Sequence, residues 1–290
     1  MVKKAVIPAA GLGTNFLPAT KAQSKEMLPI IVTPAIQYVV EEAIDSGIDD
    51  ILIIIGKEKR AIEDHFDRNP HLESVLKGKE LSDQYHHVRR IGDMANIHYI
   101  RQKETNGLGD AIRYAHQHVG EEPFALLLGD TIINSVIPVT QQLIDIYEQY
   151  RRTIVAVEAV TDDRVSRFGI VGGKKISDML WSITELVEKP APEKTPSNLA
   201  LAGRYILTPE IFKSLEETPP DKNKDIQLTD ALQLLLDKED IYAYQIEGKR
   251  YDLGTIIDYL KTIVDFSVND KDVSGEFIVY LKEVVKKYGG

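Results

Sequence analysis

Cysteine is absent from this 290-residue chain, so disulfide bridges, thiolate metal sites and a cysteine nucleophile are all excluded. Long apolar runs are missing too, because no stretch approaches the roughly 18 apolar residues that span a bilayer. The first residues, MVKKAVIPAAG, reach proline and glycine before any apolar stretch long enough for a signal peptide. From these absences we expect a cytoplasmic protein with no membrane insertion.

Basic residues are in short supply. Lysine and arginine number 35 against 45 aspartates and glutamates, which gives a net charge of −10. This balance argues against broad binding to nucleic acid or to a membrane surface, since both need a basic face. It does not argue against phosphate ligands, for which a few local cations and a metal ion suffice.

Apolar, strand-like runs alternate with helical patterns in the first half of the chain. Strands are predicted over 4–8, 50–55, 97–101 and 124–128, and a helix over 35–46. Strands separated by helices predict an α/β fold, here a Rossmann-like, mixed but mostly parallel sheet flanked by helices. Ligands of such sheets bind at the carboxyl ends of the strands.

The pattern changes after residue 150. Short strands with few helices between them are predicted over 153–160, 168–171, 183–187, 200–207 and 241–246, which indicates a smaller, more antiparallel, β-rich part. Two amphipathic helices are predicted over 255–266 and 275–287. With no long linker and no internal repeat, we expect one domain over 1–290 that ends in a helical part at about 255–290.

The most informative segment is AVIPAAGLGTNFLPATKAQSKEMLP, residues 5–29. An apolar strand runs into a turn that contains Gly11 and Gly13, and Lys25 follows it. Glycine lets backbone N–H groups close on anionic oxygens, and a lysine adds a mobile positive charge. The turn matches neither G-x-G-x-x-G, which needs glycine at Phe16, nor the P-loop pattern. A bare Gly-x-Gly is more often only a turn, so the residues behind it decide its meaning.

Those residues are Thr14, Pro18, Thr20, Lys25, Met27, Leu28 and Pro29. Together with the glycines they resemble the G-x-G-T-R-x-x-P-x-T-x-x-x-P-K signature of the nucleotide-sugar pyrophosphorylases. The segments AAGLGT, FLPATKAQ, KEMLP, IQYVVEEA, VEKP, GRYIL and IQLTDA are similar to the bacterial uridylyltransferases of that family that act on UTP and glucose 1-phosphate. The resemblance extends over roughly residues 3–270.

The resemblance implies an Mg²⁺-dependent transfer in which a sugar 1-phosphate oxygen attacks the α-phosphorus of a nucleoside triphosphate and pyrophosphate leaves. The expected substrates are UTP and glucose 1-phosphate, and the expected product is UDP-glucose. Such a displacement needs charge neutralisation and in-line positioning more than acid–base chemistry. In the family the C-terminal helices contribute to subunit association, so a homodimer is expected.

The resemblance assigns a role to each matching residue of the nucleotide site. The nucleotide-binding residues it implies are Ala9, Ala10, Gly11, Gly13, Thr14, Gln102 and Gly107. Lys25 would neutralise the α-phosphate, although composition alone would make it a solvated surface lysine. Gln102 would read uracil, because an amide can pair with both the ring N3–H and a ring carbonyl.

Sugar and metal residues are implied in the second half. Glu188 would accept hydrogen bonds from sugar hydroxyls, Lys189 would hold the sugar phosphate as a second catalytic residue, and Gly203 would contact the sugar through its backbone. Asp130 ends an apolar strand in LLLGDT and would bind Mg²⁺. Asp252 is either a second metal ligand or the cap of the helix that begins near 255.

The chain departs from the family pattern at several positions. Asn15 replaces an arginine, Ser24 a proline, Val32 and Thr33 an Asp-Lys pair, Asp110 a histidine, and Thr131 a second aspartate. Losing the arginine removes a charge-assisted hydrogen bond to the triphosphate of about 1.5–3 kcal/mol, roughly a ten- to hundredfold effect. The alternative to a working enzyme is therefore a weak or silent paralogue that binds nucleotide sugar and regulates a partner. Retention of Lys25, Asp130, Glu188 and Lys189 favours the enzyme.

The histidines carry no predicted function. His86 with His87, and His116 with His118, lack the i, i+4 helical spacing and the acidic partners of a metal site. They are predicted to be surface residues.

Overall fold

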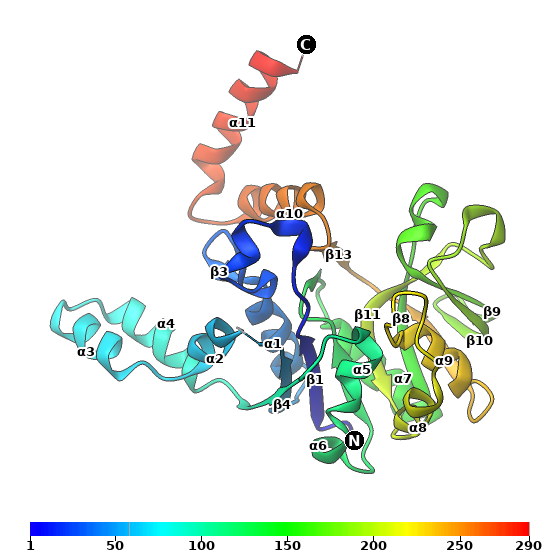
Figure 1. Ribbon diagram of the computed structural model, residues 1–290. Coiled ribbons are helices and arrows are strands. Elements are labelled where there is room, and N and C mark those ends of the chain that lie inside the picture. Colours follow the sequence, from blue (N-terminus) through cyan, green and yellow to red (C-terminus); the bar gives the residue numbers. More distant parts are fainter. Residues whose placement is uncertain (58, 290) are drawn as a thin grey trace.

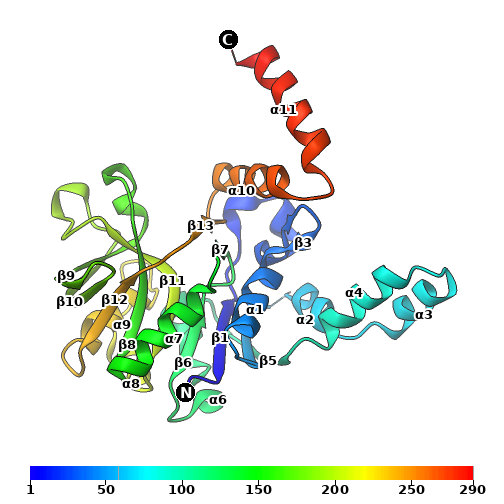
Figure 2. The ribbon, with the colours of Figure 1, turned by 180° about the vertical axis from the view of Figure 1, so that it is seen from behind.

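A computed structural model describes residues 1–57 and 59–289, and its centre is one large sheet (Figures 1 and 2). Within these residues the sheet has nine strands in the order β5-β4-β1-β6-β11-β8-β12-β10-β9. The strands are β1 (Lys4–Ala9), β4 (Asp50–Ile55), β5 (Asn96–Arg101), β6 (Phe124–Leu127), β8 (Thr153–Ala159), β9 (Gly169–Ser177), β10 (Leu180–Glu188), β11 (Leu199–Leu207) and β12 (Ile241–Gln245). This sheet runs through both halves of the chain. The single domain over 1–290 stays a prediction, and residues 58 and 290 lie outside the described residues.

The first half forms the parallel part of the sheet, as predicted. β1 pairs in parallel with β4 and β6, and β4 pairs in parallel with β5. One face is covered by α1 (Ala35–Asp45) and α7 (Val139–Tyr150), and the other by α5 (Gly107–Arg113), α6 (His116–Val119), α8 (Glu210–Glu217) and α9 (Leu228–Leu235). Both faces are therefore buried, which explains why β4 is continuously apolar rather than alternating.

The second half is more antiparallel, also as predicted. β11 pairs antiparallel with β6 and β8, and β10 pairs antiparallel with β9 and β12. The sequence predicts few helices here, but two helices, α8 and α9, lie between β11 and β12. β9 also extends well beyond the predicted 168–171. Its outer end is exposed and charged, so the sequence there lacks the apolar pattern by which a strand is predicted.

Helices α2 (Arg60–Phe66), α3 (Pro70–Gly78) and α4 (Ser82–Gly92) were not predicted. Few of their residues are buried, so their sequence carries little apolar periodicity. α3 and α4 form a hairpin that extends from the side of the sheet (Figure 1). Its base is tied by Arg68, which donates to both carboxylate oxygens of Glu73 at 2.6 Å.

The C-terminal part crosses the molecule before it becomes helical. β13 (Lys249–Asp252) pairs antiparallel with β7 (Thr131–Asn134), and the small ladder β2 (Pro29–Ile30) with β3 (Thr33–Pro34) lies near it. α10 (Ile256–Asn269) packs Tyr259, Ile263 and Phe266 against this region. α11 (Ser274–Tyr288) has no buried residue and projects away from the body (Figures 1 and 2). Among the residues described, no helix has the length and apolarity that crossing a membrane would require.

Candidate functional site

The glycine-rich loop after β1 packs directly against the turn that carries Lys25. Gly13 has a φ of 65°, and its carbonyl accepts a hydrogen bond from Thr20 Oγ1 at 2.7 Å. A Cβ at Gly13 would lie 3.2 Å from Cβ of Lys25, so both the left-handed backbone and the close approach require glycine. The motif residues Gly13, Thr20 and Lys25 are thus in mutual contact.

A cavity of about 440 Å³ opens above this loop. Of the predicted nucleotide-binding residues it is lined by Ala10, Gly11, Gly13, Thr14, Gln102 and Gly107, and Lys25 also lines it. Ala9 does not line the cavity, because it is the last residue of β1 and is buried in the core. Thr105 and Asp225 also line the cavity, and sequence reasoning did not single them out.

Gln102 is buried at the inner end of this cavity, and its amide is held in one orientation. Its Nε2 donates to Asp110 Oδ2 at 2.8 Å, which leaves Oε1 as the atom for a ligand. Gly107 starts α5 with a φ of 93°, and a Cβ there would lie 2.7 Å from the Ile226 carbonyl oxygen. Asp110, which replaces the family's histidine, therefore fixes the orientation of the Gln102 amide, the group expected to read the base.

A second cavity of about 290 Å³ adjoins the first. It is lined by the predicted residues Glu188, Lys189, Gly203 and Asp252. Asp130, Leu108 and Leu128 line both cavities. The carboxylate of Asp130 therefore lies where the two compartments meet.

Lys25 and Asp130 form an ion pair at this junction. Lys25 Nζ lies 2.5 Å from Asp130 Oδ2. Burial alone would lower the pKa of Lys25, but the carboxylates of Asp130 and Glu26 outweigh burial and raise it above its ordinary value. Burial opposes ionisation of Asp130 as well, yet the Lys25 ammonium holds the pKa of this carboxyl below its ordinary value. Both groups are charged at neutral pH.

Asp252 lies beside Asp130 because β13 pairs with β7, which places Asp252 opposite Thr131. The pKa of Asp252 is raised, first by burial and then by the negative charge of Asp130. The cap of α10 is Thr255, whose side chain accepts from the Asp258 N–H, so Asp252 does not have the capping role. Two neighbouring carboxylates with an excess of negative charge fit a hard divalent cation.

Glu188 and Lys189 lie at the far side of the second cavity. Glu188 Oε2 accepts a hydrogen bond from Thr229 Oγ1 at 2.5 Å, and Glu188 Oε1 lies 3.4 Å from Lys189 Nζ. Lys189 has a φ of 46°, a left-handed backbone that a lysine adopts at a cost of about 1 kcal/mol or more. Strain of this kind gathers at functional sites, so it supports the assignment of this pair to the site.

Sequence reasoning missed several residues of the second cavity. They are Arg167, Tyr205, Gln227, Thr229 and Arg250. Arg250 lies over the Phe168 ring at 4.4 Å and donates through Nε to Glu158 Oε1 at 2.7 Å. Gln227 and Thr229 belong to IQLTDA, and Tyr205 to GRYIL, segments already singled out for their resemblance. The resemblance therefore covered these three residues, but it assigned no role to any of them.

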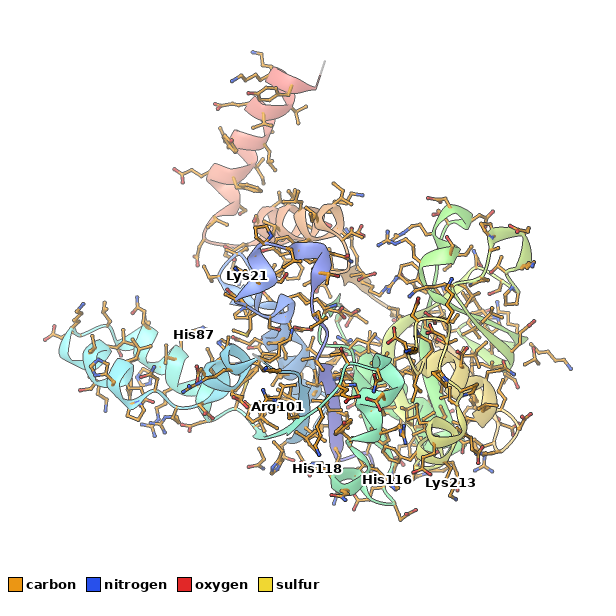
Figure 3. The ribbon with its side chains drawn as sticks, viewed as in Figure 1. Lys21, His87, Arg101, His116, His118 and Lys213 are labelled. Carbon is orange, nitrogen blue, oxygen red and sulfur yellow. The ribbon has the colours of Figure 1, made fainter. Side chains whose placement is uncertain are left out.

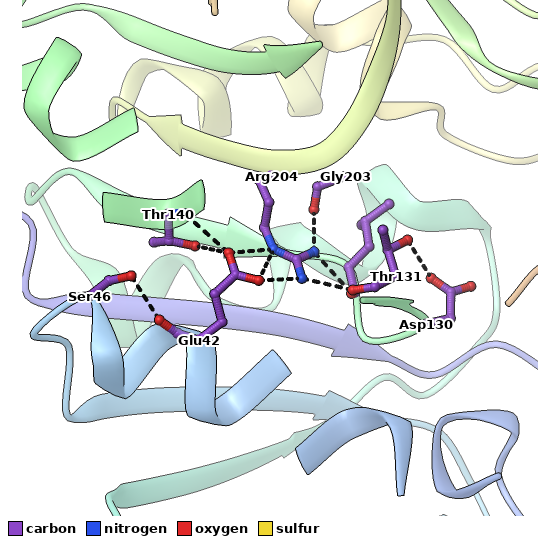
Figure 4. A network of polar contacts seen from close by, with 8 residues as sticks. Glu42, Ser46, Asp130, Thr131, Thr140, Gly203 and Arg204 are labelled. Atoms are coloured by element: carbon purple, nitrogen blue, oxygen red, sulfur yellow. Dashed lines mark hydrogen bonds and ion pairs between the residues drawn. The ribbon is translucent and has the colours of Figure 1, made fainter. Parts of the chain in front are cut away.

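A buried polar network supports the Asp130 segment from behind (Figure 4). Arg204 is fully buried and pairs with Glu42 at 2.8 Å, and Glu42 also accepts from Thr140. Arg204 then donates to the carbonyls of Thr131 at 2.7 Å and Gly203 at 2.9 Å. One guanidinium thus holds β11 against the start of β7, next to residues that the sequence predicts to bind metal and sugar.

The substituted loop positions have new partners. Asn15 Nδ2 donates to the Gly254 carbonyl at 3.0 Å and so ties the loop to the turn that follows Asp252. Ser24 hydrogen bonds Glu26 and accepts from Lys59 Nζ at 3.1 Å, and Lys59 also lies 3.2 Å from Glu26. These three buried side chains flank the turn that carries Lys25.

One prediction about the histidines is wrong. His118 has an acidic partner, because its Nε2 lies 2.8 Å from Asp50 Oδ1. Asp50 is the first residue of β4, 68 positions away, so a search for neighbours in sequence could not find it.

Comparison with known proteins gives a consistent picture. The family model described as "Nucleotidyl transferase" matches residues 4–267. A UTP–glucose-1-phosphate uridylyltransferase of Staphylococcus epidermidis is 47% identical over 283 residues, which cover 98% of either chain. The crystal structure of a UDP-glucose pyrophosphorylase complexed with UDP-glucose is 42% identical with a TM-score of 0.85, covering 93% of this chain and 100% of that one. A UTP-bound UGPase from Acinetobacter baumannii is 36% identical with a TM-score of 0.91, covering 98% of this chain and 99% of that one.

Proposed function

This chain belongs to the nucleotidyl transferase family, and from that premise we propose that it is a UTP–glucose-1-phosphate uridylyltransferase. It would join UTP and glucose 1-phosphate to form UDP-glucose and pyrophosphate. The observation that carries the proposal is the pair of cavities that meet at Asp130, one lined by the phosphate-loop residues and the other by Glu188 and Lys189. This arrangement fits two phosphorylated reactants that must meet at one phosphorus atom.

The first cavity suits the nucleotide. The backbone N–H groups of the Gly11 to Thr14 loop would hold the triphosphate, since no side chain intervenes there. Because Asp110 engages Nε2 of Gln102, the Oε1 atom is left to accept from the uracil N3–H. A base without a donor at that position would leave a buried amide oxygen unsatisfied, which supports selectivity for UTP.

Lys25 would act on the α-phosphate. In the absence of substrate its ammonium is neutralised by Asp130 at 2.5 Å. An arriving triphosphate competes for this ammonium, and charge that builds up on the α-phosphate strengthens the contact. The sugar phosphate oxygen forms the new bond to the α-phosphorus while the bond to the β-phosphate oxygen breaks, and pyrophosphate leaves with its electron pair.

Asp130 and Asp252 would hold a divalent cation. Their fit rests on geometry: Asp252 lies opposite Thr131 in the β7–β13 ladder, and both carboxylates line the second cavity. Burial, and then the negative charge of Asp130, raises the pKa of Asp252. When bound, the cation, for which we propose Mg²⁺, would neutralise phosphate charge on both reactants. Oxygen ligands are the donors that Mg²⁺ prefers.

The second cavity suits glucose 1-phosphate. Glu188, held by Thr229, would offer a carboxylate to sugar hydroxyls, and Lys189, which lines the same cavity, would hold the sugar phosphate. Arg167 and Arg250 add positive charge to the same cavity. The names of the similar proteins support an active transferase rather than the silent binding protein that the altered loop also allowed.

We further propose that the enzyme is a cytoplasmic homodimer. UTP and sugar phosphates are multiply charged and do not cross a bilayer unaided, so the enzyme is expected where they are made. α11 exposes Val279, Tyr280, Val285 and Tyr288, and none of its residues is buried within the chain. A helix with a free apolar face gains most by packing against a second copy.

The direct test mixes purified protein with UTP, glucose 1-phosphate and Mg²⁺ and follows pyrophosphate release. We expect turnover that requires all three components and yields UDP-glucose. A panel of other sugar 1-phosphates and triphosphates then measures the selectivity of the two cavities. Lack of turnover above background would contradict the proposal.

A further inference from the structure

Two histidines and an aspartate converge at the edge of the sheet opposite the active site. They are Asp50, His98 and His118, and one ligand atom from each lies within 4.8 Å of the others. Nε2 of His118 is 2.8 Å, and Nε2 of His98 is 3.7 Å, from the same oxygen, Oδ1 of Asp50. The two imidazole rings lie 4.9 Å apart, centre to centre.

The fold explains why residues so distant in sequence meet. β4 and β5 are parallel neighbours in which Leu52 is paired with His98, so Asp50, two residues earlier, projects from the same face as His98. That face is the one covered by α6, whose Val119 packs in the same core cluster as Leu52. His118, next to Val119, therefore lies above the start of both strands, and Figure 3 shows it at the same edge of the molecule as the N-terminus in Figure 1.

We propose that Asp50, His98 and His118 form a binding site for a divalent transition-metal ion of the zinc class. Two imidazole nitrogens and one carboxylate oxygen are donors that suit Zn²⁺, whereas Mg²⁺ prefers oxygen ligands alone. The site is thus chemically distinct from the carboxylate pair Asp130 and Asp252. Solvent supplies the fourth ligand, because the side chain of His98 is 54% exposed.

The geometry needs only small side-chain adjustments. Metal–ligand bonds of about 2.0–2.1 Å in a tetrahedral site separate neighbouring ligand atoms by about 3.3 Å. The distances from the two histidine nitrogens to Asp50 Oδ1, 2.8 and 3.7 Å, lie on either side of that value. The side chain of His98 is exposed, so its ring is free to turn toward a bound ion.

A nearby cation, Lys4, is already neutralised. Lys4 is paired with Asp50 across the β1–β4 ladder, but its Nζ donates to the carbonyls of His118 and Val119 at 3.0 and 3.2 Å. It also lies 3.5 Å from Glu122 Oε2. Its charge is thus directed to the backbone of α6, where it fixes the segment that carries His118. A bound ion would link β4, β5 and α6 and stabilise this edge of the fold.

The test is a zinc titration of the chain without a histidine tag, after chelator treatment, in the presence of excess Mg²⁺. We expect one saturable Zn²⁺ site per chain by calorimetry and a higher melting temperature with zinc. His98→Ala, His118→Ala and Asp50→Asn should each weaken the affinity by at least about tenfold, because removing a ligand should cost no less than disturbing its support. Co²⁺ binding should give the visible absorption bands of a four-coordinate site and lose them in His118→Ala.

Two controls isolate the site. His116→Ala removes a histidine from the same short helix, but its ring stacks on Phe212 at 4.5 Å and is not part of the cluster, so zinc affinity should stay unchanged. The double variant Asp130→Asn, Asp252→Asn removes the carboxylates of the active site and should also retain zinc binding. The proposal is overturned if no saturable site is found, if the three ligand variants bind as tightly as the original chain, or if the Asp130 and Asp252 variant abolishes binding.

Discussion

At the scale of single residues, the site is organised by pairs of opposite or competing charges. Lys25 and Asp130 neutralise each other in the absence of substrate, whereas burial and the negative charge of Asp130 outweigh the nearby arginines and raise the pKa of Asp252. The first pair is ready to exchange partners when phosphate arrives. The second arrangement stores unfavourable energy that a bound cation would relieve.

Replacing Lys25 with alanine should lower kcat by at least about 100-fold, because it removes the ammonium that meets charge developing on the α-phosphate. Pyrophosphate release under saturating substrates measures the effect. The control is Lys21→Ala, which removes an exposed lysine of the same segment and should leave kcat nearly unchanged. Equal activities of the two variants would mean that Lys25 has no role in transfer.

Asn15→Arg should raise kcat/KM for UTP, by roughly ten- to hundredfold if the guanidinium regains a charge-assisted bond to the triphosphate. The substitution also removes the hydrogen bond to the Gly254 carbonyl. Asn15→Ala removes that bond without adding charge and therefore serves as the matched control. If Asn15→Arg is no better than Asn15→Ala, the loop has been rebuilt around asparagine rather than weakened by it.

The raised pKa of Asp252 predicts a pH dependence of cation binding. Above this raised pKa both carboxylates are charged and bind the cation; as the pH falls through it, Asp252 takes up a proton and affinity is lost. This loss begins at a higher pH than the ordinary aspartate value of 3.8. Calorimetric Mg²⁺ titrations between neutral and mildly acidic pH measure it, and Asp252→Asn should remove the dependence in that window.

The free energy of unfolding should change with pH in the direction opposite to the cation affinity. Because the folded-state pKa of Asp252 is raised, its ionisation destabilises the fold at neutral pH. The penalty shrinks as the pH falls through that pKa and is gone only below the ordinary aspartate value of 3.8. Asp252→Asn should therefore unfold at a higher urea concentration at neutral pH while binding Mg²⁺ more weakly. A variant that loses both stability and cation binding would contradict the electrostatic account of this residue.

At the scale of elements, one strand ladder and one buried ion pair hold the strand ends of the site in place. β7 pairs with β13 and so brings Asp130 and Asp252 together, and Arg204 of β11 is hydrogen bonded to the start of β7 (Figure 4). A fully buried guanidinium is tolerable only because the carboxylate of Glu42 and the carbonyls of Gly203 and Thr131 satisfy it. The network is a support for the active site as well as a part of the core.

Glu42→Gln should lower the free energy of unfolding by about 3 kcal/mol or more, because it leaves Arg204 buried without its counter-charge. Urea unfolding measures the change. Glu210→Gln is the control, since Glu210 pairs with Lys213 at 2.7 Å on the surface, where both side chains are exposed. The control should change stability by less than about 0.5 kcal/mol. Similar effects in the two variants would show that the buried pair contributes no more than a surface pair.

At the scale of the whole molecule, one sheet carries both cavities, and the C-terminal helices lie outside it. α10 packs one face on the body and leaves Ile256, Ile257 and Leu260 exposed, and α11 exposes Val279, Tyr280, Val285 and Tyr288. The proposed dimer would cover apolar side chains of this kind.

Val279→Glu together with Val285→Glu should convert the dimer into a monomer, because two carboxylates would be buried in an apolar contact. Sedimentation velocity across a range of concentrations measures the state of assembly. Lys287→Glu adds a carboxylate at an exposed position away from the stripe of Val279 and Val285 and should leave the proposed dimer intact. A monomeric original chain would end the dimer proposal without affecting the proposed transferase activity.

Much of this protein follows from local sequence. The apolar runs of β1, β4 and β6 and the periodic face of α1 were predicted to within one or two residues, because short-range patterning decides which backbone a segment adopts. The loop that lines the first cavity can also be singled out from sequence, since Gly11, Gly13, Thr14 and Lys25 lie close together along the chain. The polar helices α2, α3 and α4 were missed because they bury too little to leave a pattern.

Tertiary structure alone decided which distant residues meet. The approach of Asp252 to Asp130 depends on the β7–β13 ladder, the Arg204–Glu42 pair spans 162 positions, and the Asp50–His118 pair spans 68. None of these contacts can be predicted from spacing along the chain, because each depends on the order of the strands in the sheet. Local sequence thus determines the elements and the residues they carry, and the sheet order determines the chemistry that those residues can share.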